Sequence, residues 1–339
     1  MSQPLRLATV TVVAAIAGIS LSGSGGAAAQ TQPAARPPQS QVARVTDLVQ
    51  MMAALPDTAP ATPKQPRRVL VLGRAAGFVH ASIPLTARTI EALGQKTNAW
   101  TTVISYDLRD ISAANLQQYD AIVLASTTGK FLDDSDTNAS AARRQALLDF
   151  VRGGKGLVGI HAATDAYHGN PAGGGDGPGG GEPLWPEFIK LIGGYFKFHW
   201  NYPTQIAVKV EDPANPINAP FTTVNQAGAR VARGFSISDE VYTFNQTSWV
   251  RNNVRVLTSV DYAKMPAEIK AQEPAPQRTD QDYALSYIHR EGTGRVFVQV
   301  LGHDESIYKI TPMLGHILAG VQYAIGDLAA DDSPRPAAK

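Results

Sequence analysis

The sequence contains no cysteine among its 339 residues. Without thiols the chain can form no disulfide, and it cannot use a thiolate as a nucleophile or a metal ligand. It also lacks an excess of either charge, with 30 Lys and Arg residues against 29 Asp and Glu residues. Because nucleic acids and anionic membranes select basic surfaces, we expect neither as a partner. The sequence has no G-x-x-x-x-G-K-[ST] motif for phosphate and no internal repeat.

The first 29 residues have the order typical of a secretory signal peptide. One basic residue, Arg6, precedes an apolar stretch from Leu7 to Leu21, and small residues ending in Ala29 follow. The apolar stretch is shorter than the ~20 residues that span a bilayer. The sequence therefore predicts a signal peptide over 1–29 and a periplasmic or secreted protein, with no membrane contact after cleavage.

Three further segments are too polar, proline-rich or glycine-rich to form a core. Residues 30–66 are rich in Pro, Ala and Gln and indicate a linker. Within this linker, apolar residues at helical spacing predict one short docked helix; they are Val42, Val45, Leu48, Val49 and Met52. Residues 169–182 are predicted to form a glycine-rich loop, either a lid or a tolerated insertion, and 328–339 a disordered tail.

Between these segments, strands and helices alternate along the chain. Apolar strands are predicted at 67–73, 101–107, 119–126 and 155–161, with helices at 82–95 and 139–154. Later strands are predicted at 203–211 and 253–261, then a hairpin over 282–303 and a closing helix over 312–327. Continuous apolar strands separated by helices predict a three-layer α/β domain over 67–327 with a mainly parallel sheet.

Several of these stretches together are similar to the ThuA-like (trehalose-utilisation) family. The matching pieces, in family order, are "FVHAS", "GKGLVGIHAATD", "WPEFIKLIGGYFKFHW", "DEVYTFN", "GTGRVFVQVLGHDESIY" and "ILAGVQYAIGD". The resemblance implies a class I glutamine amidotransferase-like (flavodoxin-like) fold with additional β-hairpin segments. The chain departs from the family at "YIHREGTGR", where a Trp is usual, and at the "YAIG" ending.

The turn after the fourth strand is the main candidate for chemistry. In amidotransferase-like folds this elbow reads G-x-C-x-G, whereas here "GIHAA" (159–163) places His161 at the cysteine position. Glutamine hydrolysis through a thioester is therefore excluded. His161 can still act as a general base, a general acid or a metal ligand. Asp165, four residues on, is predicted to orient His161 or to contact a substrate hydroxyl; its alternative role is to cap the turn.

Other polar side chains follow strands whose carboxyl ends would share one edge of the sheet, where such folds bind ligands. With His161, the residues His199 and His303 could hold Zn²⁺, and the alternative is a hydrogen-bonded pocket without metal. Glu240 and Tyr242 are predicted on one face of a strand, where Glu240 would transfer protons. We expect His80, Thr127 and Tyr242 to contact the substrate.

Together, the resemblance and these side chains predict an exported enzyme that acts on a small carbohydrate. A disaccharide or an oxidised 3-keto sugar is the expected substrate, with His161, Asp165 and Glu240 as catalytic residues. A non-catalytic sugar-binding domain is the main alternative, and a partner-binding module is a third. No cofactor is required by the sequence, although a divalent metal such as zinc fits the histidines. Assembly into a homo-oligomer is left open.

Overall fold

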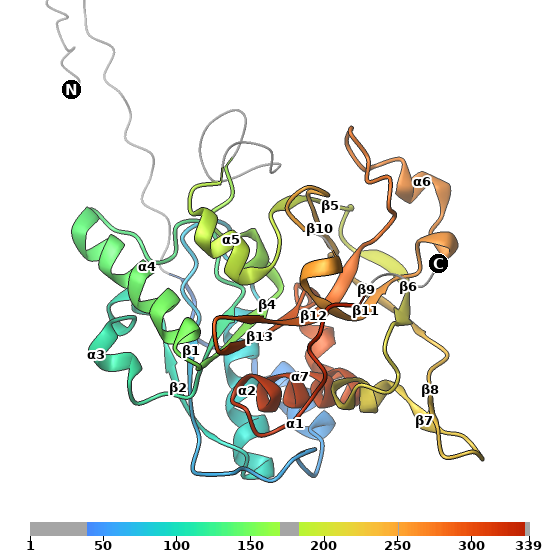
Figure 1. Ribbon diagram of the computed structural model, residues 1–339, viewed down its shortest axis with the longest axis horizontal. Helices are drawn as coiled ribbons and strands as arrows, with labels where there is room; N and C mark the ends of the chain where they lie inside the picture. Colours follow the sequence, from blue (N-terminus) through green and yellow to red (C-terminus); the bar gives the residue numbers. More distant parts are fainter. Residues whose placement is uncertain (1–38, 170–182, 250, 336–339) are drawn as a thin grey trace, which may run out of the picture. The chain divides into compact units, whose positions relative to one another are not determined.

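A nine-stranded sheet with helices on both faces forms the centre of the protein (Figure 1). The structure, a computed structural model, describes residues 39–169, 183–249 and 251–335. The predicted signal peptide and nearly all of the predicted glycine-rich loop lie outside these residues. No helix within the described ranges is long and apolar enough to span a membrane.

The first half of the chain builds a parallel sheet of alternating strands and helices. Strands β1 (Arg68–Leu72), β2 (Thr101–Ser105), β3 (Ala121–Ala125) and β4 (Gly156–Ile160) lie in the order β2-β1-β3-β4. All of their pairings are parallel. The main connecting helices are α2 (Ile83–Thr97), the short α3 (Ala113–Leu116) and α4 (Thr137–Arg152).

The second half extends the same sheet. Strand β13 (Gly294–Gln299) pairs in parallel with β4, and the next strands are β12 (Ala284–Glu291), β11 (Arg255–Val260), β6 (Thr204–Val210) and β9 (Phe235–Asp239). Each of these last four pairs antiparallel with its neighbour. Strands β11 and β9 therefore run in the direction of β13, and only β12 and β6 oppose it. The carboxyl ends of β1, β4, β9 and β13 consequently point toward the same side of the sheet.

Alternation along the strands separates two cores. In β1, Val69 and Val71 pack into one core while Leu70 and Leu72 pack into the other, because successive side chains of a strand point to opposite faces. Helices α2 and α7 (Thr311–Ala324) cover the first face. Helices α4 and α5 (Pro186–Ile192) cover the second. The predicted three-layer α/β fold is confirmed.

Small strands and one-turn elements complete the described chain. Strands β5 (Phe196–His199) and β10 (Tyr242–Phe244) form a separate antiparallel pair, as do β7 (Thr223–Val224) and β8 (Arg230–Val231). A short helix, α6 (Ala267–Lys270), follows β11. The pair β5–β10 is the one that matters for the site, since it carries side chains toward the carboxyl edge of the sheet.

The short helix predicted in the linker is present, but it docks through the other face. Helix α1 (Val45–Ala54) buries Asp47, Met51 and Ala54, and the carboxylate of Asp47 lies 2.7 Å from the Lys309 ammonium. The apolar stripe expected to dock is largely in solvent, with Val45 74% exposed. A buried ion pair and Met51, rather than the valines, therefore fix the helix.

The domain is wider at both ends than the predicted 67–327. On the amino-terminal side, the Ala61 amide donates to the side chain of Gln322 at 2.9 Å. On the carboxyl-terminal side, part of the tail predicted as disordered is held by ion pairs. Asp331 pairs with Arg255 at 3.0 Å, and Asp332 pairs with Arg290 at 2.6 Å. Leu55 and Leu328 also pack into the core, so both segments are held by polar and apolar contacts.

Candidate metal centre

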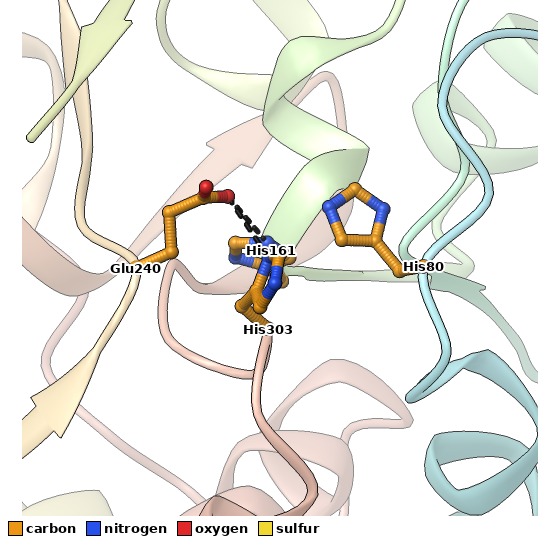
Figure 2. A group of neighbouring side chains, drawn as sticks. All are labelled: His80, His161, Glu240 and His303. Carbon is orange, nitrogen blue, oxygen red and sulfur yellow. Dashed lines mark hydrogen bonds and ion pairs between the residues drawn. The ribbon is translucent and has the colours of Figure 1, made fainter. Parts of the chain in front are cut away.

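Four side chains from distant parts of the sequence converge at the carboxyl edge of the sheet. His80 follows β1, His161 follows β4, Glu240 follows β9 and His303 follows β13. One potential ligand atom from each lies within 4.8 Å of all the others. In Figure 2, His161 and His303 lie between Glu240 on one side and His80 on the other. The predicted convergence is thus observed for these four residues.

His161 is held in a strained turn that aims its ring at the cluster. Its backbone has φ +47°, which is uncommon for a residue other than glycine, and a 3₁₀ helix (His161–Asp165) follows at once. Its Nδ1 lies 2.9 Å from the carbonyl oxygen of Val300, which can only accept, so Nδ1 carries the proton. The other nitrogen, Nε2, is left to face Glu240.

The contact between His161 and Glu240 calls for a positive charge. Nε2 of His161 lies 3.4 Å from Oε2 of Glu240 and makes no hydrogen bond within the described chain. With Nδ1 protonated, two lone pairs would face each other across this gap. A proton on Nε2 or a metal cation between the two atoms removes that repulsion, and the carboxylate and imidazoles supply the ligands for a cation.

His80 is a neutral imidazole with an unused nitrogen. Its side chain is buried, and Nδ1 has no hydrogen-bond partner among the described residues. Burial, with the nearby charges of His161 and His303, lowers the pKa of His80 to about 2. In Figure 2 the nitrogen of His80 that faces the cluster is Nε2, and Nδ1 points away from it. Nε2 has a long contact of 3.4 Å with the Tyr242 hydroxyl, and it is the atom that could bind a metal ion.

Glu240 and His303 form the charged part of the cluster. Burial favours a higher pKa for Glu240, but its close contacts with His161 and His303 outweigh burial and hold that pKa well below its ordinary value. Burial favours a lower pKa for His303, yet its Nδ1 contact of 3.0 Å with Glu240 raises that pKa. The three histidines and one ionised carboxylate match the nitrogen and oxygen ligands that Zn²⁺ and related divalent ions prefer.

Two residues that the sequence reasoning missed position His303. The buried carboxylate of Asp239 accepts from the Gly302 amide at 2.6 Å and from the Asp304 amide at 2.9 Å. Gly302 has φ +136°, and a Cβ there would lie 2.6 Å from the hydroxyl of Tyr308. Each of these two residues directly precedes a predicted site residue in the sequence, Asp239 before Glu240 and Gly302 before His303. The contact between Asp239 and Gly302, however, appears only in the folded structure.

Asp165 does not orient His161, because the carbonyl of Val300 does so instead. A 3₁₀ helix has about three residues per turn, so a residue four positions on is rotated by roughly 120° from the first. Asp165 instead lies 2.6 Å from Nδ1 of His168. Burial raises the pKa of Asp165. A catalytic role for Asp165 stays a prediction.

His199 lies beside the cluster and not within it. Its Nδ1 is 3.2 Å from Oε1 of Glu240, and 44% of its side chain is exposed to solvent. The predicted metal ligands were His161, His199 and His303. In the structure, the residues that can share one ion are His161 and His303 with His80 and Glu240, and His199 is not among them. His199 therefore borders the centre on its solvent side.

Tyr242 also reaches the cluster, although by a different path from the one predicted. Glu240 lies between strands, after the end of β9 and before β10, so it does not share a strand with Tyr242. Even so, the Tyr242 hydroxyl is 3.4 Å from Nε2 of His80, and its ring centroid is 4.4 Å from that of His161. Burial raises the pKa of Tyr242 well above its ordinary value, so the phenol stays protonated.

The end of β3 contributes two hydroxyl groups. Ser126 and Thr127 are fully buried, and neither hydroxyl has a hydrogen-bond partner among the described residues. Because Ala125 of β3 pairs with Ile160 of β4, Ser126 and His161 follow at neighbouring strand ends. The sequence places both residues at a strand end, and Thr127 was the one predicted to contact the substrate.

The strand order, the helices on both faces and the elbow at His161 define an α/β protein of the flavodoxin-like, class I glutamine amidotransferase-like kind. The chain belongs to the ThuA family, described as trehalose utilisation, whose family model matches residues 68–324.

Solved structures of two ThuA-like proteins agree with this fold. The protein from Bacteroides uniformis is 16% identical, with a TM-score of 0.56 over 78% of this chain and 93% of the other. The protein from Parabacteroides merdae is 17% identical, with a TM-score of 0.51 over 77% and 91% of the two chains. At these identities the likeness establishes the fold alone. Among curated proteins, none matches the chain significantly.

Proposed function

We propose that this protein is an exported, metal-dependent enzyme that acts on a small carbohydrate, either a disaccharide or a 3-keto sugar. The observation that carries the proposal is the cluster of His80, His161, Glu240 and His303, whose ligand atoms lie within 4.8 Å of one another. The buried Nε2 of His161, which has no hydrogen-bond partner among the described residues, supports a bound cation. The trehalose-utilisation family supports the class of substrate.

The residues of the candidate site have different proposed roles in binding the cation and the substrate. A divalent ion at this centre would act as a Lewis acid toward a carbonyl or hydroxyl oxygen of the sugar. Glu240 is ionised, so it would hold the cation, and its oxygen that faces His199 can accept a hydrogen bond from the substrate or from water. Tyr242, which stays protonated, can donate a hydrogen bond to a sugar oxygen. His199 is exposed beside Glu240, where it can contact the substrate.

The first test is metal content. Purified protein is treated with EDTA, reloaded with Zn²⁺, Mn²⁺ or Fe²⁺, and measured by elemental analysis. We expect about one ion per chain in the wild type and none in His161→Ala. His161 is fully buried, so its removal also lowers stability. His316→Ala is the matched control, because His316 is equally buried but lies outside the cluster. It should keep the ion.

The second test is turnover. Trehalose and a 3-keto disaccharide are incubated with metal-loaded protein, and products are followed by chromatography. The proposal requires turnover that disappears with EDTA and returns with metal.

Two outcomes would contradict parts of the proposal. Equal metal content in the wild type and His161→Ala, in the first test, would contradict the metal centre. A bound metal and a bound sugar without turnover would favour the alternative, a sugar-binding domain that uses the same residues without catalysis.

A further inference from the structure

A second polar cavity lies at the carboxyl ends of β1 and β2. It has a volume of about 600 Å³ and shares no residue with the metal centre. Its lining includes Arg74, Ser105, Tyr106, Asp107, Arg109 and Asp134. In parallel α/β sheets, the carboxyl ends of the strands are where ligands bind. The cavity is therefore in a favourable position for a second small molecule.

Most charges in this cavity are already paired. Asp107 accepts hydrogen bonds from the side chain of Arg109, with Nε of Arg109 at 2.8 Å from Oδ2 of Asp107. Asp134 lies 2.9 Å from Arg143. Arg74 is the exception, because its guanidinium donates only to the carbonyl of Phe131 and has no carboxylate within 4.0 Å in the described chain. The lining carries two positive and two negative side chains, and the guanidinium of Arg74 is the one of these that no ion pair holds.

Arg74 is unusual in this respect. Most of the other arginines in the interior of the domain form an ion pair with at least one carboxylate. These arginines are Arg67, Arg143, Arg251, Arg255 and Arg278. Burial lowers the pKa of Arg74, and the more distant carboxylates of Asp134 and Asp107 offset that effect only in part. Its Nε and Nη2 groups make no hydrogen bond within the described chain and are not sealed from solvent. They remain available to a ligand.

We propose that this cavity binds a small hydroxylated anion, with Arg74 as the residue that holds its carboxylate or phosphate group. A guanidinium presents two parallel N–H groups that suit either anion. Tyr106, whose pKa is raised by burial, stays protonated and supplies a hydrogen-bond donor, and Ser105 supplies a hydroxyl. These neighbours suit the hydroxyl groups of a sugar acid or a sugar phosphate.

Isothermal titration of the full-length mature protein with glucuronate, glucose 6-phosphate and glucose tests the site. We expect one or both anions to bind and neutral glucose to bind at least ten-fold more weakly. The stronger anion identifies the group as a carboxylate or a phosphate. Arg74→Gln should lose at least ten-fold in affinity for it. Arg230→Gln, the same charge change on the exposed β7–β8 pair, should bind like the wild type.

Metal content in each variant separates this site from the metal centre, and it should be unchanged in Arg74→Gln. If that variant does not fold, Arg74→Lys replaces it; the charge stays but the two-pronged contact is lost, so affinity should still fall. Equal affinity in Arg74→Gln and the wild type would overturn the proposal, as would equal binding of glucose and glucuronate. An equal loss in Arg230→Gln would show a general charge effect and would also overturn it.

Discussion

At the residue scale, His161 explains why the chain cannot use a cysteine nucleophile and why it presents an imidazole at the same position. His161 occupies the elbow position that a cysteine nucleophile takes in amidotransferase-like folds, and it keeps the strained backbone with φ +47°. That backbone, together with the carbonyl of Val300, turns Nε2 toward Glu240. The elbow therefore presents an imidazole to a cluster of ligands.

Asp239 is expected to control the metal centre without being a ligand. Asp239→Asn removes one acceptor oxygen, so one of the amides of Gly302 and Asp304 loses its partner and His303 is held less firmly. Residues that orient ligands in this way typically change metal affinity by about 10–100-fold. We expect a loss of that size, measured by competition with a fluorescent zinc chelator. An unchanged affinity would show that the loop is rigid without Asp239.

At the element scale, α1 shows how an amphipathic pattern can mislead. The valines of this helix have helical spacing, yet the face that docks contains Asp47 and Met51. Local periodicity says only that one face is apolar. Which face meets the domain depends on the partner surface, and here the Lys309 ammonium selects the face that carries Asp47.

Two substitutions in α1 should separate the docked face from the exposed one. Met51→Ala removes a fully buried side chain and should lower the free energy of unfolding by about 2–4 kcal/mol. Val49→Ala, at a side chain that is 64% exposed, should change it by less than about 0.5 kcal/mol. Urea denaturation followed by circular dichroism measures both. A larger loss for Val49→Ala would mean that the valine stripe is covered in solution.

At the scale of the whole molecule, two buried histidines outside the metal centre couple stability to pH. Burial lowers the pKa of His289 and of His316 from 6.5 to about 4 in each case. The unfolded chain therefore binds more protons between pH 6.5 and 4, and stability falls as pH is lowered through that window. The two groups contribute stability that is complete above pH 6.5 and lost by about pH 4, roughly 3 kcal/mol each.

Thermal melts of metal-free protein at several pH values between 7 and 4 measure this effect. His316→Asn is less stable overall but lacks one of the titrating groups, so its melting temperature should fall less steeply over this range. The same slope in the variant and the wild type would show that His316 is not the cause.

Export is also a property of the whole chain. Expression of the full-length gene in its native host, followed by mass spectrometry, should give a mature protein that begins at Gln30 in the periplasmic or culture fraction. This follows from the basic, apolar and small-residue order of 1–29. Recovery from the cytoplasm with Met1 retained would contradict it.

The sequence by itself determined the class of fold and the side of the sheet where the candidate site residues lie. Apolar runs of strand length, separated by helical periodicity, leave few alternatives to a sheet covered on both faces, as β1 to β4 confirm. Because polar residues that follow such strands share one edge, His80, His161 and His303 could be placed together before any distance was known.

Only the tertiary structure decided which side chains meet. Glu240 joins the histidines because β9 ends near the loop after β13, and Asp239 ties the two together. His199 stays on the solvent side, and Arg74 is left without a carboxylate. The alternation of strands and helices follows from local patterns, but the strand order and distances of 3–5 Å depend on sheet twist, loop paths and long-range pairing. Those are set by the packing of the whole chain.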